Sequence, residues 1–231
     1  AGGEELRDTL CRESVTYTVR RNNIEVAASH RFCNAAPVTI AIYYGMQSMF
    51  EGETHVLTPG GAYTDWTEAA KASTFTKQEH PLFRRYVEKN RQGYQSTWLL
   101  PDGLGDHALL DGQDDIFIYA PYGKSYHKLF GNKRMENGDK TCWRGVYTWF
   151  ETPVADDADL LCYEGSAGGH TAVFIDCKRA CKRTLALPGY LDLRHFGTAE
   201  QNSGIRISAA GRNKLKIKAD APGSCVLLLR E

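Results

Sequence analysis

The chain has 231 residues, of which 42% are hydrophobic and 24% charged, and its 28 lysines and arginines balance 28 aspartates and glutamates. This composition is ordinary for a globular protein and argues against an intrinsically disordered chain. The formal net charge of zero disfavours a surface for duplex nucleic acid, so we expect no nucleic-acid partner. No apolar run approaches the roughly 18 residues that a membrane-spanning helix needs, so we expect no membrane span.

The first part of the chain shows the two-residue period of β-strands. An alternating V-T-Y-T-V run within residues 1–20 predicts a first strand. In residues 24–66, alternating apolar positions such as Val38, Ile40 and Ile42 are separated by turn residues, including P-G-G at 59–61. This stretch predicts about four antiparallel strands that form half of a β-sandwich.

Residues 67–92 show the one helical pattern in the chain. Thr67 can cap a short helix that runs through Ala72. Pro81 suits the first turn of a second helix, in which Tyr86 and Val87 share an apolar face with the leucine and phenylalanine at 82 and 83. We therefore expect a short helical insertion at 67–92.

The second half of the chain returns to strands and turns. Strands are predicted over 96–100, 116–120, 142–150, 160–163, 170–175, 184–193, 204–207, 215–217 and 225–229. The absence of βαβ alternation disfavours a parallel sheet. We therefore expect a mainly β protein built from one or more antiparallel β-sandwiches with a short helical insertion.

The predicted division is a β-sandwich-like domain at 1–100 and a second β-rich region at 101–231, packed on the first or forming a separate small domain.

Seven cysteines are more than a cytosolic enzyme of this size usually carries. They lie at 11, 33, 142, 162, 177, 181 and 225, and predict up to three disulfides in an extracellular or periplasmic protein. Cys177 and Cys181 form the only close pair, which disfavours structural zinc, and we expect no metal and no cofactor. The start at Ala1 without a leader pattern fits either a removed signal peptide or a truncated chain.

Aromatic side chains are dense enough to form a stacking surface for sugars or peptides. Strand aromatics usually fill a core, but two adjacent tyrosines at 43 and 44 cannot both face inward on a regular strand. Other aromatics lie beside the basic stretch at 124–134. We therefore predict a binding surface for a protein or a cell-surface glycan that contains Tyr44, Tyr122, Tyr126, His127 and Trp143.

One segment suggests an enzyme instead. The sequence D-L-L-C-Y-E-G-S-A-G-G-H-T-A-V-F-I-D, at 159–176, resembles the part of NlpC/P60 and CHAP cysteine peptidases that carries a G-H-x-A-V motif. The resemblance implies His170 as general base and Cys142 as nucleophile, and an acid such as Asp176 would orient the histidine. The preferred hypothesis is a binding or structural module, and the alternative is a cysteine hydrolase acting on peptide or cell-wall amide bonds.

Overall fold

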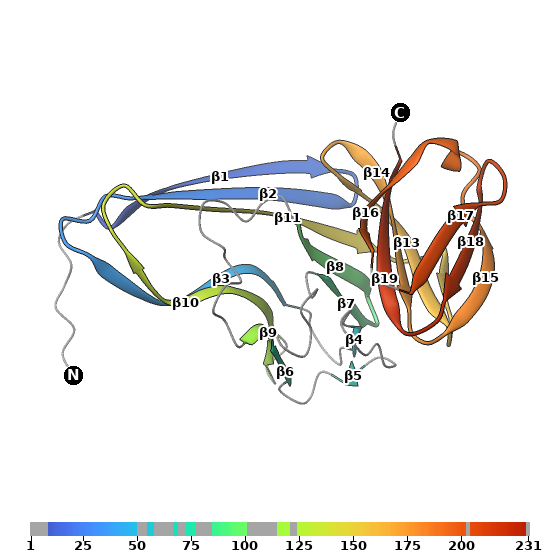
Figure 1. Ribbon diagram of the computed structural model, residues 1–231, viewed down its shortest axis with the longest axis horizontal. Helices are drawn as coiled ribbons and strands as arrows, with labels where there is room; N and C mark the ends of the chain where they lie inside the picture. The colour runs from blue at the N-terminus through green and yellow to red at the C-terminus, as the bar shows by residue number, and fades with distance from the viewer. Residues whose placement is uncertain are drawn as a thin grey trace.

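The computed structural model describes residues 9–49, 55–57, 67–68, 73–76, 85–100, 115–120, 124–201 and 204–229, and these are almost entirely β-strand (Figure 1). All the strand pairs are antiparallel, as predicted. Within the described residues, the one helical segment is the 3-10 turn η2 (Leu193–His195). No helix in this part of the chain is long and apolar enough to cross a membrane.

The described strands form four sheets, here named A to D. Sheet A has the order β1 (Cys11–Arg20), β2 (Asn23–Phe32), β11 (Lys140–Phe150), β8 (Gly93–Leu99), β7 (Arg85–Asn90), β4 (His55–Leu57) and β5 (Thr67–Glu68). Sheet B contains β3 (Val38–Met49), β10 (Lys124–Met135), β9 (Asp115–Ala120) and β6 (Ser73–Thr76). Sheet C contains β12 (Ala155–Asp156), β13 (Leu160–Ala167), β14 (His170–Cys177), β19 (Gly223–Leu229) and β16 (Phe196–Gln201). Sheet D contains β15 (Cys181–Ala186), β18 (Lys214–Ala219) and β17 (Ile205–Ala209).

The sheets stack in the order B, A, C, D, with a hydrophobic core between each neighbouring pair. Sheet A belongs to two of these cores, because successive residues of a strand point to opposite faces. On β8, for example, Trp98 packs in the core shared with sheet C, whereas Leu99 packs in the core shared with sheet B. The third core joins sheets C and D, the sandwich at the C-terminal end of the chain (Figure 1).

The helical insertion predicted at 67–92 is wrong wherever the structure describes that segment. Residues 67–68, 73–76 and 85–90 form strands β5, β6 and β7, while Pro81 lies outside the described residues. The backbone of β7 is paired with β4 on one edge and with β8 on the other. Tyr86 and Val87 are both fully buried on opposite faces of that strand, so tertiary pairing overrides the local helical pattern.

The predicted division at residue 100 falls within sheet A. Strand β11, which follows that position, pairs with β2 and β8, which precede it. Strand β10 likewise pairs with β3. Among the described residues, the strands from β1 to β11 therefore form sheets A and B, and the strands from β12 to β19 form sheets C and D.

The disulfide framework predicted from the sequence is absent, because all seven cysteines are free thiols in this structure. In the core of sheets C and D, Ile175 is the paired neighbour of both Cys162 and Cys225 and lies between them. Two strand spacings of about 4.8 Å separate these cysteines by about 10 Å between Cα atoms, beyond the roughly 7 Å limit for a disulfide. Cys142 is paired with Ser29, so no cysteine lies directly across from it on β2.

Candidate binding site

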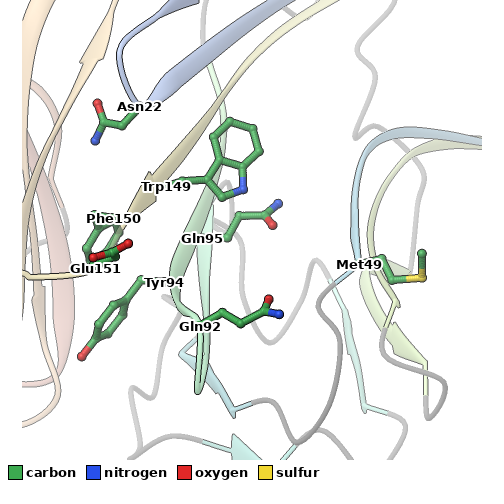
Figure 2. A pocket seen from close by; sticks show the side chains of 8 residues that line it. All are labelled: Asn22, Met49, Gln92, Tyr94, Gln95, Trp149, Phe150 and Glu151. Atoms are coloured by element: carbon green, nitrogen blue, oxygen red, sulfur yellow. The ribbon is translucent and has the colours of Figure 1, made fainter.

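A pocket of about 640 Å³ opens where the end of sheet A faces strand β3 of sheet B (Figure 2). Segments that are far apart in the sequence build its walls. The lining residues are Asn22, Met49, Gln92, Tyr94, Gln95, Trp149, Phe150 and Glu151. Small-molecule sites commonly have volumes of roughly 300–1,000 Å³, so this pocket has the size of a ligand site.

The end of β11 supplies the aromatic surface of the pocket. Tyr147 and Trp149 share a face of the strand, and their ring centroids lie 5.9 Å apart in a stacked arrangement. The Tyr147 hydroxyl donates to the carbonyl of Gln47 at 2.8 Å and accepts from the Gln47 N–H at 3.0 Å, which ties β11 to β3. Burial raises the pKa of Tyr147 to about 12, so its hydroxyl keeps its proton. Trp149 is 37% exposed, which leaves part of its indole available to a ligand.

Side-chain amides lie beside this indole. Figure 2 shows Gln92 and Gln95 on the same side of the sheet as Trp149, toward β3, whereas Tyr94 and Phe150 lie on the opposite side. The rings of Tyr94 and Phe150 stack with centroids 4.7 Å apart and form part of the pocket rim. Each amide offers both hydrogen-bond donors and an acceptor. The pocket therefore combines one aromatic surface with groups that can bind hydroxyls.

The turn between β7 and β8 holds Gln92 at the pocket. Its backbone N–H donates to Oδ1 of Asn90 at 2.7 Å. Gly93, which closes the turn, has a φ of +131°, and a Cβ there would lie 2.9 Å from the carbonyl oxygen of Phe150. Only glycine tolerates this backbone angle and this close approach, so the sequence fixes the position of Gln92 through Gly93.

A buried polar cluster lies next to the pocket, between sheets A and B. Glu88 is the paired neighbour of Gln95 and is fully buried. Its carboxylate accepts hydrogen bonds from the hydroxyls of Ser48 and Ser125, each at 2.5 Å, and Ser48 Oγ also lies 2.9 Å from the hydroxyl of Tyr86. Burial raises the pKa of Glu88, and this effect outweighs the two hydroxyl hydrogen bonds. The cluster fixes the spacing of the two sheets beside the pocket.

The binding residues predicted from the sequence do not gather at one place. The rings of Tyr44 and Tyr126 lie on sheet B with centroids 4.7 Å apart and an interplanar angle of 36°, and both residues are partly buried. His127 is 1% exposed and Trp143 is 7% exposed, so both lie in the interior between sheets A and B. Tyr122 lies outside the described residues. A binding role for these five residues stays a prediction.

The three residues of the hydrolase alternative lie on two strands. Cys142 is a partly buried thiol on β11, and His170 is exposed at the start of β14. Asp176 is six residues farther along β14, about 20 Å from His170 at roughly 3.3 Å per residue. Both carboxylate oxygens of Asp176 accept hydrogen bonds from Arg85. Asp176 is therefore not placed to orient His170, and a hydrolytic role for Cys142 and His170 stays a prediction.

Comparisons with protein-family models, with curated proteins and with solved structures found no match to this chain. In the described part of the chain, no group of three His, Cys, Asp or Glu side chains is arranged to hold a metal ion. The geometry of the pocket itself is therefore the basis for assigning a function.

Sequence reasoning did not single out the residues that line this pocket. Trp149 belongs to the dense set of strand aromatics, but alternation alone does not show which end of a strand stays exposed. The signal for Gln92 and Gln95 is weaker, because polar residues beside a glycine turn are common in every β protein. Only the pairing of β8 with β11 brings them beside Trp149.

Proposed function

We propose that this protein is a binding module that recognises a cell-surface glycan through the pocket at Trp149. The observation that carries the proposal is the partly exposed indole of Trp149 beside the amides of Gln92 and Gln95. A sugar ring has an apolar face that stacks on an aromatic ring, and its hydroxyls need both donors and acceptors. An indole with neighbouring amides meets both needs.

The shape of the site favours a glycan over a protein partner. A typical protein–protein interface buries roughly 1,600 Å² over a broad surface. The pocket is instead a local hollow of about 640 Å³, lined by eight of the described residues, which suits a ligand that inserts a small group. An extracellular or periplasmic location is part of this proposal, because cell-surface glycans are encountered there.

The test is glycan binding by the purified protein and by the Trp149→Ala variant. A glycan array would identify a ligand, and isothermal titration would give its affinity. We expect Trp149→Ala to weaken binding at least about tenfold, or about 1.4 kcal/mol, because it removes the stacking surface. Tyr190→Ala is the matched control, since Tyr190 is an aromatic residue that is 68% exposed on the loop after β15 and does not line the pocket. The control should bind as the wild type does.

Two results would contradict the proposal. One is a glycan that binds wild type and Trp149→Ala with equal affinity, which would place recognition elsewhere. The other is the absence of any glycan ligand together with tight binding of a protein through the same residues. Circular dichroism of each variant would show that a loss of binding does not come from unfolding.

A further inference from the structure

A second pocket of about 260 Å³ lies at the junction of sheets A and C and takes no part in the proposed glycan site. Its apolar wall contains Trp98 of β8 and Leu100 just after that strand, with Ala167 and Leu228 from sheet C. Trp98 is 2% exposed and Leu100 is 5% exposed, so the wall is part of the core between the two sheets. The hollow therefore offers an apolar surface to a ligand.

The rim of this pocket carries a guanidinium group and an imidazole. Arg144, on β11, and His170, at the start of β14, both line the pocket. Nη2 of Arg144 donates to Oε1 of Glu25 at 2.7 Å, and Oε2 of Glu25 accepts from the backbone N–H of Gly168 at 2.9 Å. Glu25 thereby fixes the Arg144 side chain, which is still 35% exposed.

Two arginines and one carboxylate meet at this rim. Burial raises the pKa of Glu25, but the hydrogen bonds from Arg144 and Gly168 and the charges of Arg144 and Arg20 lower it by more, so Glu25 stays ionised. Arg20 also reaches the glycine turn beside His170, where its guanidinium lies 3.5 Å from the position of a Cβ on Gly169. Guanidinium and imidazole N–H groups therefore stand at the mouth of an apolar hollow, where a partly exposed guanidinium can present its planar donors to a carboxylate.

We propose that this pocket binds a small carboxylate with an apolar body, such as a medium-chain fatty acid. The carboxylate would bind the guanidinium of Arg144 beside His170, and the apolar body would lie against Trp98, Leu100 and Leu228. A volume of about 260 Å³ lies near the lower end of the roughly 300–1,000 Å³ range of small-molecule sites, so it suits a ligand with on the order of ten non-hydrogen atoms. Octanoate has this size.

The test is titration of the full chain with octanoate, followed by calorimetry and by intrinsic fluorescence, because Trp98 lines the pocket. Octanol is the neutral control and octylamine the cationic control. We expect octanoate to bind with a Kd on the order of 1 mM or tighter, and octanol and octylamine to bind at least about tenfold more weakly. Arg144→Gln should weaken octanoate binding at least about tenfold. Arg179→Gln, which changes an exposed arginine at the end of sheet C, should leave it unchanged.

Three outcomes would overturn the proposal. The first is that octanoate does not bind at concentrations on the order of the expected Kd. The second is that octanoate and octanol bind with equal affinity. The third is that wild type and Arg144→Gln bind octanoate with equal affinity. If Arg144→Gln fails to fold, Ala167→Leu fills the pocket from the other sheet, and unchanged octanoate binding by that variant would also overturn the assignment. Trp149→Ala should bind octanoate normally, so this result is independent of the glycan test.

Discussion

Replacement of Asp176 by alanine tests the junction of sheets A and C directly. Asp176 on β14 and Arg85 on β7 form an ion pair whose side chains are 0% and 2% exposed. Nη1 of Arg85 donates to Oδ2 of Asp176 at 2.5 Å and to the hydroxyl of Tyr163 at 2.9 Å, and Nη2 donates to the other carboxylate oxygen. The pair is therefore a buried, hydrogen-bonded link between two layers.

The expected cost follows from this burial. Asp176→Ala leaves the Arg85 guanidinium in the interior without its carboxylate, and breaking a buried pair in this way costs about 3–5 kcal/mol. In a chain of this size each kcal/mol lowers Tm by roughly 2–4 °C, so we expect Tm to fall by roughly 6–20 °C. Urea unfolding followed by circular dichroism, together with a thermal scan, would measure both quantities.

The cost of Asp176→Ala has two parts, the loss of the ion pair and the burial of Arg85 without its carboxylate, and a double variant separates them. Arg85→Met with Asp176→Leu should be more stable than Asp176→Ala alone, because apolar residues can replace a buried ion pair at little cost. Asp220→Ala is the control, since its pair with Arg206 is at least half exposed and should change stability by less than about 1 kcal/mol. A cost below about 1 kcal/mol for Asp176→Ala, or a double variant no more stable than the single one, would refute this reasoning.

Three further predictions concern other parts of the fold. Gly45→Ala should destabilise the protein by about 1–3 kcal/mol in urea unfolding, because its Cβ would lie 2.8 Å from Cγ of buried Leu129, and in a double variant with Leu129→Ala the two losses should sum to less than their separate values. Burial raises the pKa of Asp156, but hydrogen bonds from Lys178, Lys89 and Tyr94 lower it to about 2, below the unfolded value of about 3.9. Its stabilisation of about 2 kcal/mol should therefore be present at neutral pH and lost as pH falls from about 4 to 2, and Asp156→Asn should abolish that pH dependence. Burial also raises the pKa of the Cys162 thiol, so native iodoacetamide mapping should leave Cys162 unmodified, and rapid modification would contradict the buried position.

Strand periodicity was enough to predict the fold class, because sheets with one buried and one exposed face impose a two-residue pattern. The predicted strands at 142–150 and 170–175 correspond closely to β11 and β14. The helical error at 85–90 has a specific cause. Arg85 and Glu88 look like solvated helix charges, but both are buried and hydrogen-bonded to neighbouring sheets. Long-range partners of this kind are not visible in local sequence.

The candidate site could not be assembled from the sequence for a related reason. The pocket at Trp149 depends on the pairing of β11 with both β2 and β8, strands that begin more than forty residues earlier in the chain. Alternation specifies which residues share a face but not which strands become neighbours. The sequence therefore indicates that Tyr147 and Trp149 share a face, while the positions of Gln92 and Gln95 beside them follow only from the sheet order.

The two proposed sites use opposite faces of the same strand. Along β11, Trp149 belongs to the face toward sheet B, whereas Arg144 belongs to the face toward sheet C. A slip of one residue in the register of β11 would exchange these faces, so both sites require the same pairing with β2 and β8. A variant that shifts β11 should therefore abolish glycan and carboxylate binding together. Trp149→Ala and Arg144→Gln should instead each abolish only one, which distinguishes a local loss of contacts from a change in the sheet.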